Sequence, residues 1–262
     1  MVLSILKNNG WIDDSTDLSA LFDGLDEITS ETDTPKDDNN PENHEIIFNS
    51  FRNLSPDKVK VLIIGQDPYP DTRKAHGLAF SFKDGSIPPK DSLINIFKKI
   101  THDLNIENQY PHLTCWRNQG VLLLNTVLTF KKEQDKNEQA KSREKHLQFW
   151  KNFINYAIEK LLAEKMNATE PLVIMLWGGK ANALKSLKYK SIDADLELEK
   201  TKNIKIIRSS HPSKMMQACD RAIFNNTDPA FNDDNYTPFK TCNEFLASKG
   251  CEEIDWNTFV CE

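Results

Sequence analysis

The chain has 262 residues, of which 39% are hydrophobic and 27% charged, a composition typical of a globular protein with one large or two small domains. No apolar run approaches the roughly 18 residues that a membrane helix needs, and residues 1–11 lack the features of a secretory signal. We therefore expect a cytoplasmic protein, or a nuclear one in a eukaryote. The five cysteines are nowhere spaced as Cys-x-x-Cys, which disfavours a disulfide framework, a zinc finger and a cysteine-held iron–sulfur cluster.

The net charge of −6 is unevenly distributed along the chain. Residues 12–45 hold twelve acidic side chains and one basic one, and residues 46–262 carry a net charge of +4. This pattern is compatible with a polyanion-binding domain whose acidic leader repels or mimics the polyanion. A solvated acidic surface without a role fits equally well. Residues 29–43 are polar and contain proline, as loosely held linkers do. We predict an acidic, partly disordered leader over residues 1–40 and a domain over residues 41–262 that begins near His44.

Four short apolar runs predict buried strands, and the first of them, residues 59–65, ends in glycine. The other three cover residues 121–124, 172–177 and 204–207. A helix is predicted between the second and third runs, because apolar residues from Leu147 to Leu161 recur at helical spacing. Strands that alternate with helices indicate a three-layer α/β/α fold with a central, mainly parallel sheet of about four strands.

Polar segments of unusual composition follow all four predicted strands. They read GQDPYP (65–70), NTVLTF (125–130), WGGKA (177–181) and SSHPS (209–213). Because the carboxyl ends of parallel strands meet at one edge of a sheet, we expect these segments to form a single rim. The rim would carry an acid, an amide, a glycine pair and a histidine, which are groups that an active site needs.

These segments, together with AHGLAFSF (75–82), resemble the uracil-DNA glycosylase family in sequence, order and spacing. The resemblance runs from about Pro41 to Trp256. It implies a monofunctional enzyme without metal or cofactor that flips uracil out of DNA and hydrolyses its N-glycosidic bond for base excision repair. The implied partner is uracil-containing DNA, single- or double-stranded, and we expect a monomer that does not bind membranes. The sequence identifies no protein inhibitor or replication partner.

Two residues are catalytic if the resemblance holds. Asp67 would position the attacking water and favour positive charge on the sugar, although an aspartate in a turn also caps backbone amides. His211 would donate a hydrogen bond from a neutral ring to uracil O2 as charge develops on the leaving base. A lone histidine is otherwise more often a surface or packing residue.

The same resemblance assigns four residues to uracil recognition. Asn125 would accept a hydrogen bond from uracil N3 and donate one to O4, a pattern that cytosine does not match. Phe80 would stack on the flipped base, although a core phenylalanine is the ordinary alternative. Tyr69 would stand against uracil C5 and exclude the methyl group of thymine. Gln66 is a further uracil contact in this scheme.

Contacts with DNA phosphates are assigned to small or rigid residues, because they let backbone amides approach a phosphate closely. These residues are Pro88, Pro89, Ser92, Gly178, Gly179 and Ser213. Met215 stands where the family carries a leucine that wedges into the duplex. Pro70 replaces the histidine that often ends the family's first motif. Each of the six positions assigned to phosphate contacts also fits an ordinary turn.

Two other functions stay open at this stage. The chain could be a glycosylase fold that serves as a DNA-binding or replication-accessory protein with reduced catalysis. Intact Asp67, Asn125 and His211 argue against a loss of catalysis without excluding a second role. A related enzyme for mismatched thymine is the other alternative, and Tyr69 argues against it, because a C5 methyl group needs a small residue at that site.

Overall fold

A four-stranded sheet forms the centre of the computed structural model, which describes residues 3–37, 40, 44–71, 74–83, 87, 91–167, 170–178, 202–213 and 229–259. Its strands are β1 (Val61–Gly65), β2 (Val121–Asn125), β3 (Leu172–Trp177) and β4 (Ile204–Ser209). They lie in the order β2-β1-β3-β4, and every neighbouring pair is parallel. The predicted fold class and strand number are confirmed.

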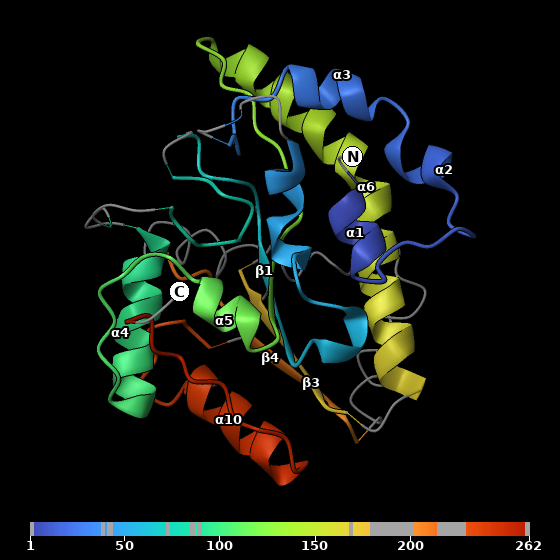
Figure 1. Cartoon of the computed structure of the whole chain (residues 1–262). Helices are drawn as coiled ribbons and strands as arrows, with labels where there is room; N and C mark the ends of the chain where they lie inside the picture. Colours follow the sequence, from blue (N-terminus) through green and yellow to red (C-terminus); the bar gives the residue numbers. More distant parts are fainter. Residues whose placement is uncertain are drawn as a thin grey trace.

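Helices cover both faces of the sheet, so each strand is buried on two sides (Figure 1). One layer holds α4 (Ser92–Leu104), α5 (Thr114–Asn118) and α10 (Pro238–Ser248). The other holds α6 (Lys136–Asn167), α1 (Ser4–Asn8), α2 (Leu18–Phe22), α3 (Leu25–Ser30), η1 (His44–Phe51) and η2 (Pro56–Lys58). None of the described helices is both long and apolar enough to cross a membrane.

Alternate residues of each strand serve the two layers, as the pleat of a strand requires. In β1, Leu62 and Ile64 pack into the core on the α6 side, whereas Val61 and Ile63 pack toward α4 and α10. Both sets are fully or almost fully buried. Burial on both faces explains why the strands read as continuous apolar runs rather than as alternating ones.

The N-terminal segment, residues 3–37, departs from the predicted leader. Its helices α1–α3 lie against α6 (Figure 1), and Leu6, Phe22 and Ile28 belong to the core on that side. Trp11 is fully buried, and its indole N–H donates to Leu54 O at 2.6 Å. The folded body therefore includes residues well before His44. The partly disordered leader predicted for residues 1–40 is corrected over residues 3–37, because a few buried apolar side chains hold this polar stretch in place.

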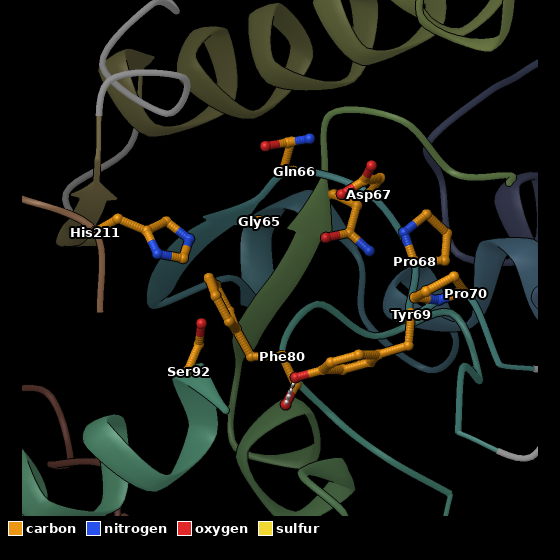
Figure 2. Close-up of a pocket in the computed structure, with 10 residues that line it drawn as sticks. Gly65, Gln66, Asp67, Pro68, Tyr69, Pro70, Phe80, Ser92 and His211 are labelled. Carbon is orange, nitrogen blue, oxygen red and sulfur yellow. Dashed lines mark hydrogen bonds between the residues drawn. The ribbon is translucent and has the colours of Figure 1, made fainter. Parts of the chain in front are cut away.

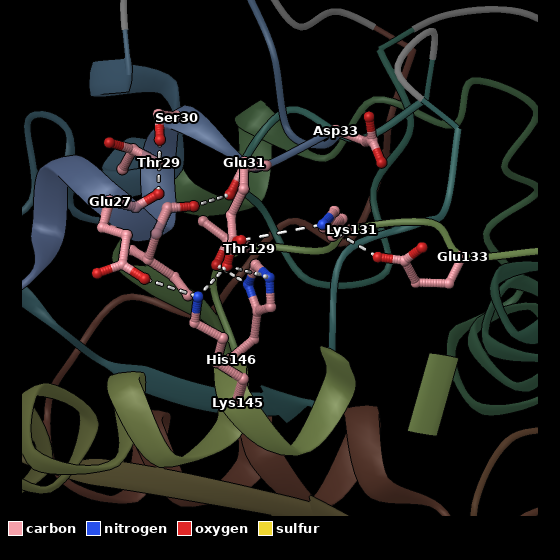
Figure 3. Close-up of polar contacts among 12 residues, drawn as sticks. Glu27, Thr29, Ser30, Glu31, Asp33, Thr129, Lys131, Glu133, Lys145 and His146 are labelled. Carbon is pink, nitrogen blue, oxygen red and sulfur yellow. Dashed lines mark hydrogen bonds and ion pairs between the residues drawn. The ribbon is translucent and has the colours of Figure 1, made fainter. Parts of the chain in front are cut away.

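The acidic charge of this segment is partly matched by lysines of the body (Figure 3). Lys145 Nζ lies 2.9 Å from carboxylate oxygens of both Glu27 and Glu31, and Lys160 Nζ lies 3.4 Å from Asp13. Exposed ion pairs of this kind contribute little stability, typically about 0–1 kcal/mol each. The buried side chains therefore hold the segment, and the lysines reduce the repulsion among its acids.

Candidate active site

The carboxyl ends of the strands meet at one edge, as the motif positions predict. Gly65 of β1 is paired with Asn125 of β2, and Trp177 of β3 is paired with Ser209 of β4. A pocket of about 220 Å³ opens at this edge. Figure 2 shows Asp67 and His211 on opposite sides of it, with Phe80 between them. The residues that line it are Gly65, Gln66, Asp67, Pro68, Tyr69, Pro70, Phe80, Ser92, Asn125 and His211.

The pocket contains the six residues predicted for catalysis and uracil recognition, and also Ser92. Gly178 and Ser213 are described but do not line it. The remaining predicted DNA contacts, Pro88, Pro89, Gly179 and Met215, lie outside the described residues. The six side chains predicted for catalysis and uracil recognition thus line one pocket, whereas their roles and the predicted phosphate contacts remain predictions.

The first two motifs are bonded to each other through their main chains. The amides of Thr126 and Val127 donate to the carbonyls of Gly65 and Gln66, both at 3.0 Å. A Cβ at Gly65 would lie 2.2 Å from Asn125 Oδ1 and 2.8 Å from the Cβ of Ala79. Only glycine therefore lets the Asn125 amide lie against the end of β1.

Asp67 leaves β1 in the turn that Pro68 follows, and its carboxylate is one-fifth exposed. Its Oδ2 accepts a hydrogen bond from Nη2 of Arg143, which belongs to α6 and whose side chain is 44% exposed. Arg143 is not among the site residues that the sequence predicts. The two residues are 76 positions apart, and an exposed arginine on a helix carries no local signal that could have revealed the contact.

His211 lies two residues beyond β4, and its ring faces the pocket (Figure 2). Its Nδ1 accepts a hydrogen bond from the main-chain N–H of Ser213 at 3.0 Å. A nitrogen that accepts carries no proton, so this contact assigns the proton of the neutral ring to Nε2. The described geometry thus presents Nε2–H as a donor.

Phe80 stands in the left-handed backbone region at φ 62°, which is uncommon for a bulky residue and costs on the order of 1–3 kcal/mol. Its ring centroid lies 5.6 Å from that of Trp177 and 6.2 Å from that of His211. The turn before it needs Gly77, since that residue has φ 84° and a Cβ there would lie 2.0 Å from Ile46 O. Backbone strain in a turn of this kind is a mark of functional sites.

Tyr69 is fixed at both ends. Its hydroxyl donates to Asp91 at 2.9 Å, and its main-chain carbonyl accepts from Thr34 Oγ1 at 3.1 Å. Asp91 also accepts from Leu93 N–H and so caps α4. Burial, together with the negative charge of Asp91, raises the pKa of the Tyr69 phenol well above its ordinary value. The ring is therefore a neutral, rigid wall of the pocket.

Among the described residues, neither a cluster of metal ligands nor a cysteine lines the pocket. The described residues include no group of three or more His, Cys, Asp or Glu side chains that could hold a metal ion. Cys115 takes part in a disulfide. Cys242 and Cys251 are free thiols. None of these three described cysteines lines the pocket.

Comparison with known proteins identifies the family. The sequence model of the Uracil DNA glycosylase superfamily matches residues 51–246. A Campylobacter hominis protein named uracil-DNA glycosylase is 40% identical over 215 residues, which cover 81% of this chain and 75% of that protein. A Bacteroides fragilis protein named uracil-DNA glycosylase 2 is 38% identical over 215 residues, covering 81% of each chain.

Solved structures agree with the sequence relatives. The crystal structure of mimivirus uracil-DNA glycosylase aligns with a TM-score of 0.59 and 25% identity, covering 82% of this chain and 74% of that one. A mimivirus UNG variant in complex with UGI aligns with a TM-score of 0.61 and 26% identity, covering 82% of this chain and 75% of that one. The chain therefore belongs to the uracil-DNA glycosylase superfamily.

Proposed function

We propose that this uracil-DNA glycosylase cleaves the N-glycosidic bond in the pocket of Figure 2, with Asp67 on the sugar side and His211 on the base side. The observation that carries the proposal is the convergence of a carboxylate, an amide, an aromatic ring and a histidine from separate loops at one sheet edge. The base must leave the duplex stack to reach this pocket, at an energetic cost that contacts with the flipped nucleotide offset.

Asp67 acts where positive charge develops. As the bond between C1′ and N1 breaks, the electron pair leaves with the base and the sugar becomes cation-like. A carboxylate beside the sugar stabilises that charge and accepts a hydrogen bond from the water that attacks C1′. The water contributes its hydroxyl to C1′, and its proton leaves for the solvent or the departing base.

His211 acts where negative charge develops. The ring needs no positive charge for this role, because a fixed neutral donor already stabilises an anion in a pocket that excludes much of the water. The Ser213 amide supports this assignment, since its hydrogen bond to Nδ1 leaves Nε2–H to point at uracil O2. The leaving base departs as an anion that this hydrogen bond holds.

Base selection belongs to the other pocket residues. Asn125 reads N3 and O4, Phe80 stacks on the base, and Gln66 provides a further polar contact. Tyr69 excludes thymine. Its two anchoring hydrogen bonds support this role, because the ring must stay in place to keep the C5 methyl group out of the pocket. The rival function of thymine excision is therefore disfavoured.

DNA contacts outside the pocket stay as the sequence predicted them. Ser92 begins α4 at the pocket edge, and with Gly178 and Ser213 it is assigned to phosphate binding. Pro88, Pro89 and Gly179 complete this group, and Met215 is assigned to wedging into the duplex. We further propose that the enzyme acts as a monomer in the cytoplasm, which light scattering and cell fractionation would test.

A gel assay with end-labelled oligonucleotides tests the proposed function. A strand with one uracil should break at that position after alkali treatment, whereas matched strands with cytosine or thymine should stay intact. Without alkali the uracil strand should also stay whole, since the enzyme hydrolyses the base and leaves the backbone. The reaction should proceed in EDTA. An intact uracil strand after prolonged incubation, or a loss of activity in EDTA that zinc or magnesium restores, would contradict the proposal.

A further inference from the structure

The ion pair between Arg143 and Asp67 conflicts with the chemistry that the proposed function assigns to Asp67. A guanidinium bonded to this carboxylate neutralises the charge that should favour a cation-like sugar. It also adds a positive charge beside the place where positive charge develops. The pair therefore suits the free enzyme better than the reacting complex.

In bound DNA, a phosphate beside the flipped nucleotide is a second possible partner for Arg143. The sugar of a flipped nucleotide carries a phosphate on each side, so a group that touches the sugar-facing carboxylate also lies near these phosphates. Guanidinium groups bind phosphate strongly, with two parallel hydrogen bonds. The Arg143 side chain is 44% exposed and Asp67 is 20% exposed, so neither is sealed away from an incoming strand.

The basic side chains next to Arg143 on α6 form ion pairs away from the pocket. Arg143 is therefore the basic side chain of this helical turn that faces the pocket. Lys141 Nζ lies 2.9 Å from Glu138 on the same helix. Lys145 Nζ is shared by Glu27 and Glu31 of the N-terminal segment. Arg143 alone of these three pairs with a residue that lines the pocket.

We propose that Arg143 is a DNA-phosphate contact that exchanges Asp67 for a phosphate beside the flipped nucleotide when DNA binds. This inference rests on the proposed function. The exchange keeps the carboxylate paired while the pocket is open to water, and it frees the negative charge of Asp67 once the sugar is in place. Because a phosphate replaces Asp67 as the partner of Arg143, the guanidinium is not left as an unpaired charge, and the freed carboxylate of Asp67 faces the sugar on which positive charge develops.

Binding and chemistry must be measured separately to test this exchange. We would compare the wild type with Arg143→Gln, Arg143→Lys and Lys160→Gln. Lys160→Gln is the matched control, since Lys160 is also on α6 and also pairs with an aspartate, Asp13, of the N-terminal segment. It removes the same charge as Arg143→Gln. Thermal melting would verify that all four proteins are folded.

Affinity would be measured with an oligonucleotide that carries 2′-fluoro-2′-deoxyuridine, whose fluorine resists cleavage by destabilising the cation-like sugar. Across a salt series, Arg143→Gln should weaken binding about tenfold and reduce the slope of log K against log salt by about one. Arg143→Lys should keep the slope, because it keeps the charge. Lys160→Gln should match the wild type. In single-turnover reactions the loss should fall on the concentration of DNA needed for half-maximal rate much more than on the maximal rate.

The opposite results would overturn the inference. An Arg143→Gln variant with the wild-type salt slope and affinity would show that Arg143 does not contact DNA. A maximal rate at least tenfold lower with unchanged affinity would show that Arg143 positions Asp67 throughout the reaction. If the wild type itself left uracil in place, the proposed function would fail, whatever the salt slopes showed.

Discussion

The pocket loops and the N-terminal segment are held in place by different forces. Main-chain hydrogen bonds and a close approach at Gly65 fix the pocket groups, which stay polar and partly open. The N-terminal segment is anchored by buried side chains such as Trp11 and Phe22, with exposed ion pairs above them. Catalytic rate and fold stability should therefore depend on different regions of the molecule. Changes in the pocket should alter the rate in an intact fold, whereas changes in the N-terminal segment should alter stability with intact chemistry.

The two regions meet at Thr34. Its main chain forms an antiparallel bridge with Phe130, five residues beyond Asn125, and its hydroxyl bonds to the carbonyl of Tyr69. The N-terminal segment thus touches both of the first two pocket loops. A change at Thr34 should therefore alter both the catalytic rate or selectivity and the stability of the fold. The variants below change residues in the pocket, in the N-terminal segment and at Thr34.

Asp67→Asn should give the largest effect. The change is nearly isosteric but removes the charge that we propose favours the cation-like sugar, so single-turnover excision should fall by about 10²- to 10⁴-fold. The free energy of unfolding should change little, since the Asp67 pair with Arg143 is partly exposed and such pairs contribute about 0–1 kcal/mol. Quench-flow or gel kinetics with urea unfolding would measure both. A rate close to that of the wild type would make Asp67 a turn residue only.

Trp11→Ala should show the converse pattern. Removing a fully buried indole from the core should lower the free energy of unfolding by about 3–5 kcal/mol. The excision rate of the folded fraction should stay near that of the wild type, because Trp11 contacts Leu54 and not the pocket. Asp14→Asn, at an exposed side chain of the same segment, is the control and should be neutral. A melting temperature unchanged in Trp11→Ala would contradict the structural role of the segment.

Asn125→Asp tests base choice inside the pocket. In the proposed scheme the Asn125 amide donates to uracil O4, whereas cytosine presents an amino group there and two donors would oppose each other. Leaving a buried donor unsatisfied costs about 1–3 kcal/mol, which corresponds to about five- to 150-fold discrimination. The Asn125→Asp variant should lose much of its uracil-excision activity and gain measurable cytosine excision. An unchanged ratio of the two activities in single-turnover assays would show that Asn125 does not read the base.

The reach of each residue's contacts decides what the sequence could predict. Asp67, Asn125 and His211 lie at or just beyond strand ends, so a parallel sheet was enough to predict that they converge. Trp11 bonds to a residue 43 positions away and Arg143 to one 76 positions away. No short motif encodes such pairs. The polar composition of residues 29–43 predicted a loose linker, because composition does not reveal that Thr34 would find partners at Phe130 and Tyr69.

Thr34→Val tests the junction of the two regions. Valine keeps the shape of threonine but removes the donor to Tyr69 O, so stability should fall by about 1 kcal/mol. Because the Tyr69 wall loses one anchor, the preference for uracil over thymine should also fall severalfold. Thr16→Val is the control: its hydroxyl bonds to the Tyr156 hydroxyl, away from the pocket. Equal selectivity in the two variants would show that the N-terminal segment does not support the wall.

The smallest expected effect is the contribution of His146 to the pH dependence of stability. His146 lies at the contact between the N-terminal segment and α6, which we call the seam and which is shown with Glu31 and Thr129 in Figure 3. Its Nδ1 lies 2.6 Å from Thr129 Oγ1, and its Nε2 lies 3.8 Å from Glu31 Oε1. Burial lowers the pKa of His146 below its ordinary value, and the charge of Glu31 only partly opposes this effect. The unfolded chain therefore binds a proton first as the pH falls through about 6.5.

Stability should consequently decrease as the pH falls from about 7.5 through 6.5, and level off below the folded pKa. His146→Gln should reduce this dependence by about a few tenths of a kcal/mol, once screening at the seam is taken into account. It should not abolish the dependence, because burial also lowers the pKa of His76, which acts in the same direction. Urea unfolding of the wild type and the variant at several pH values would measure the difference. A wild type that gains stability between pH 7.5 and 5.5, or a variant with a steeper loss, would show that His146 is charged in the folded seam and pairs with Glu31.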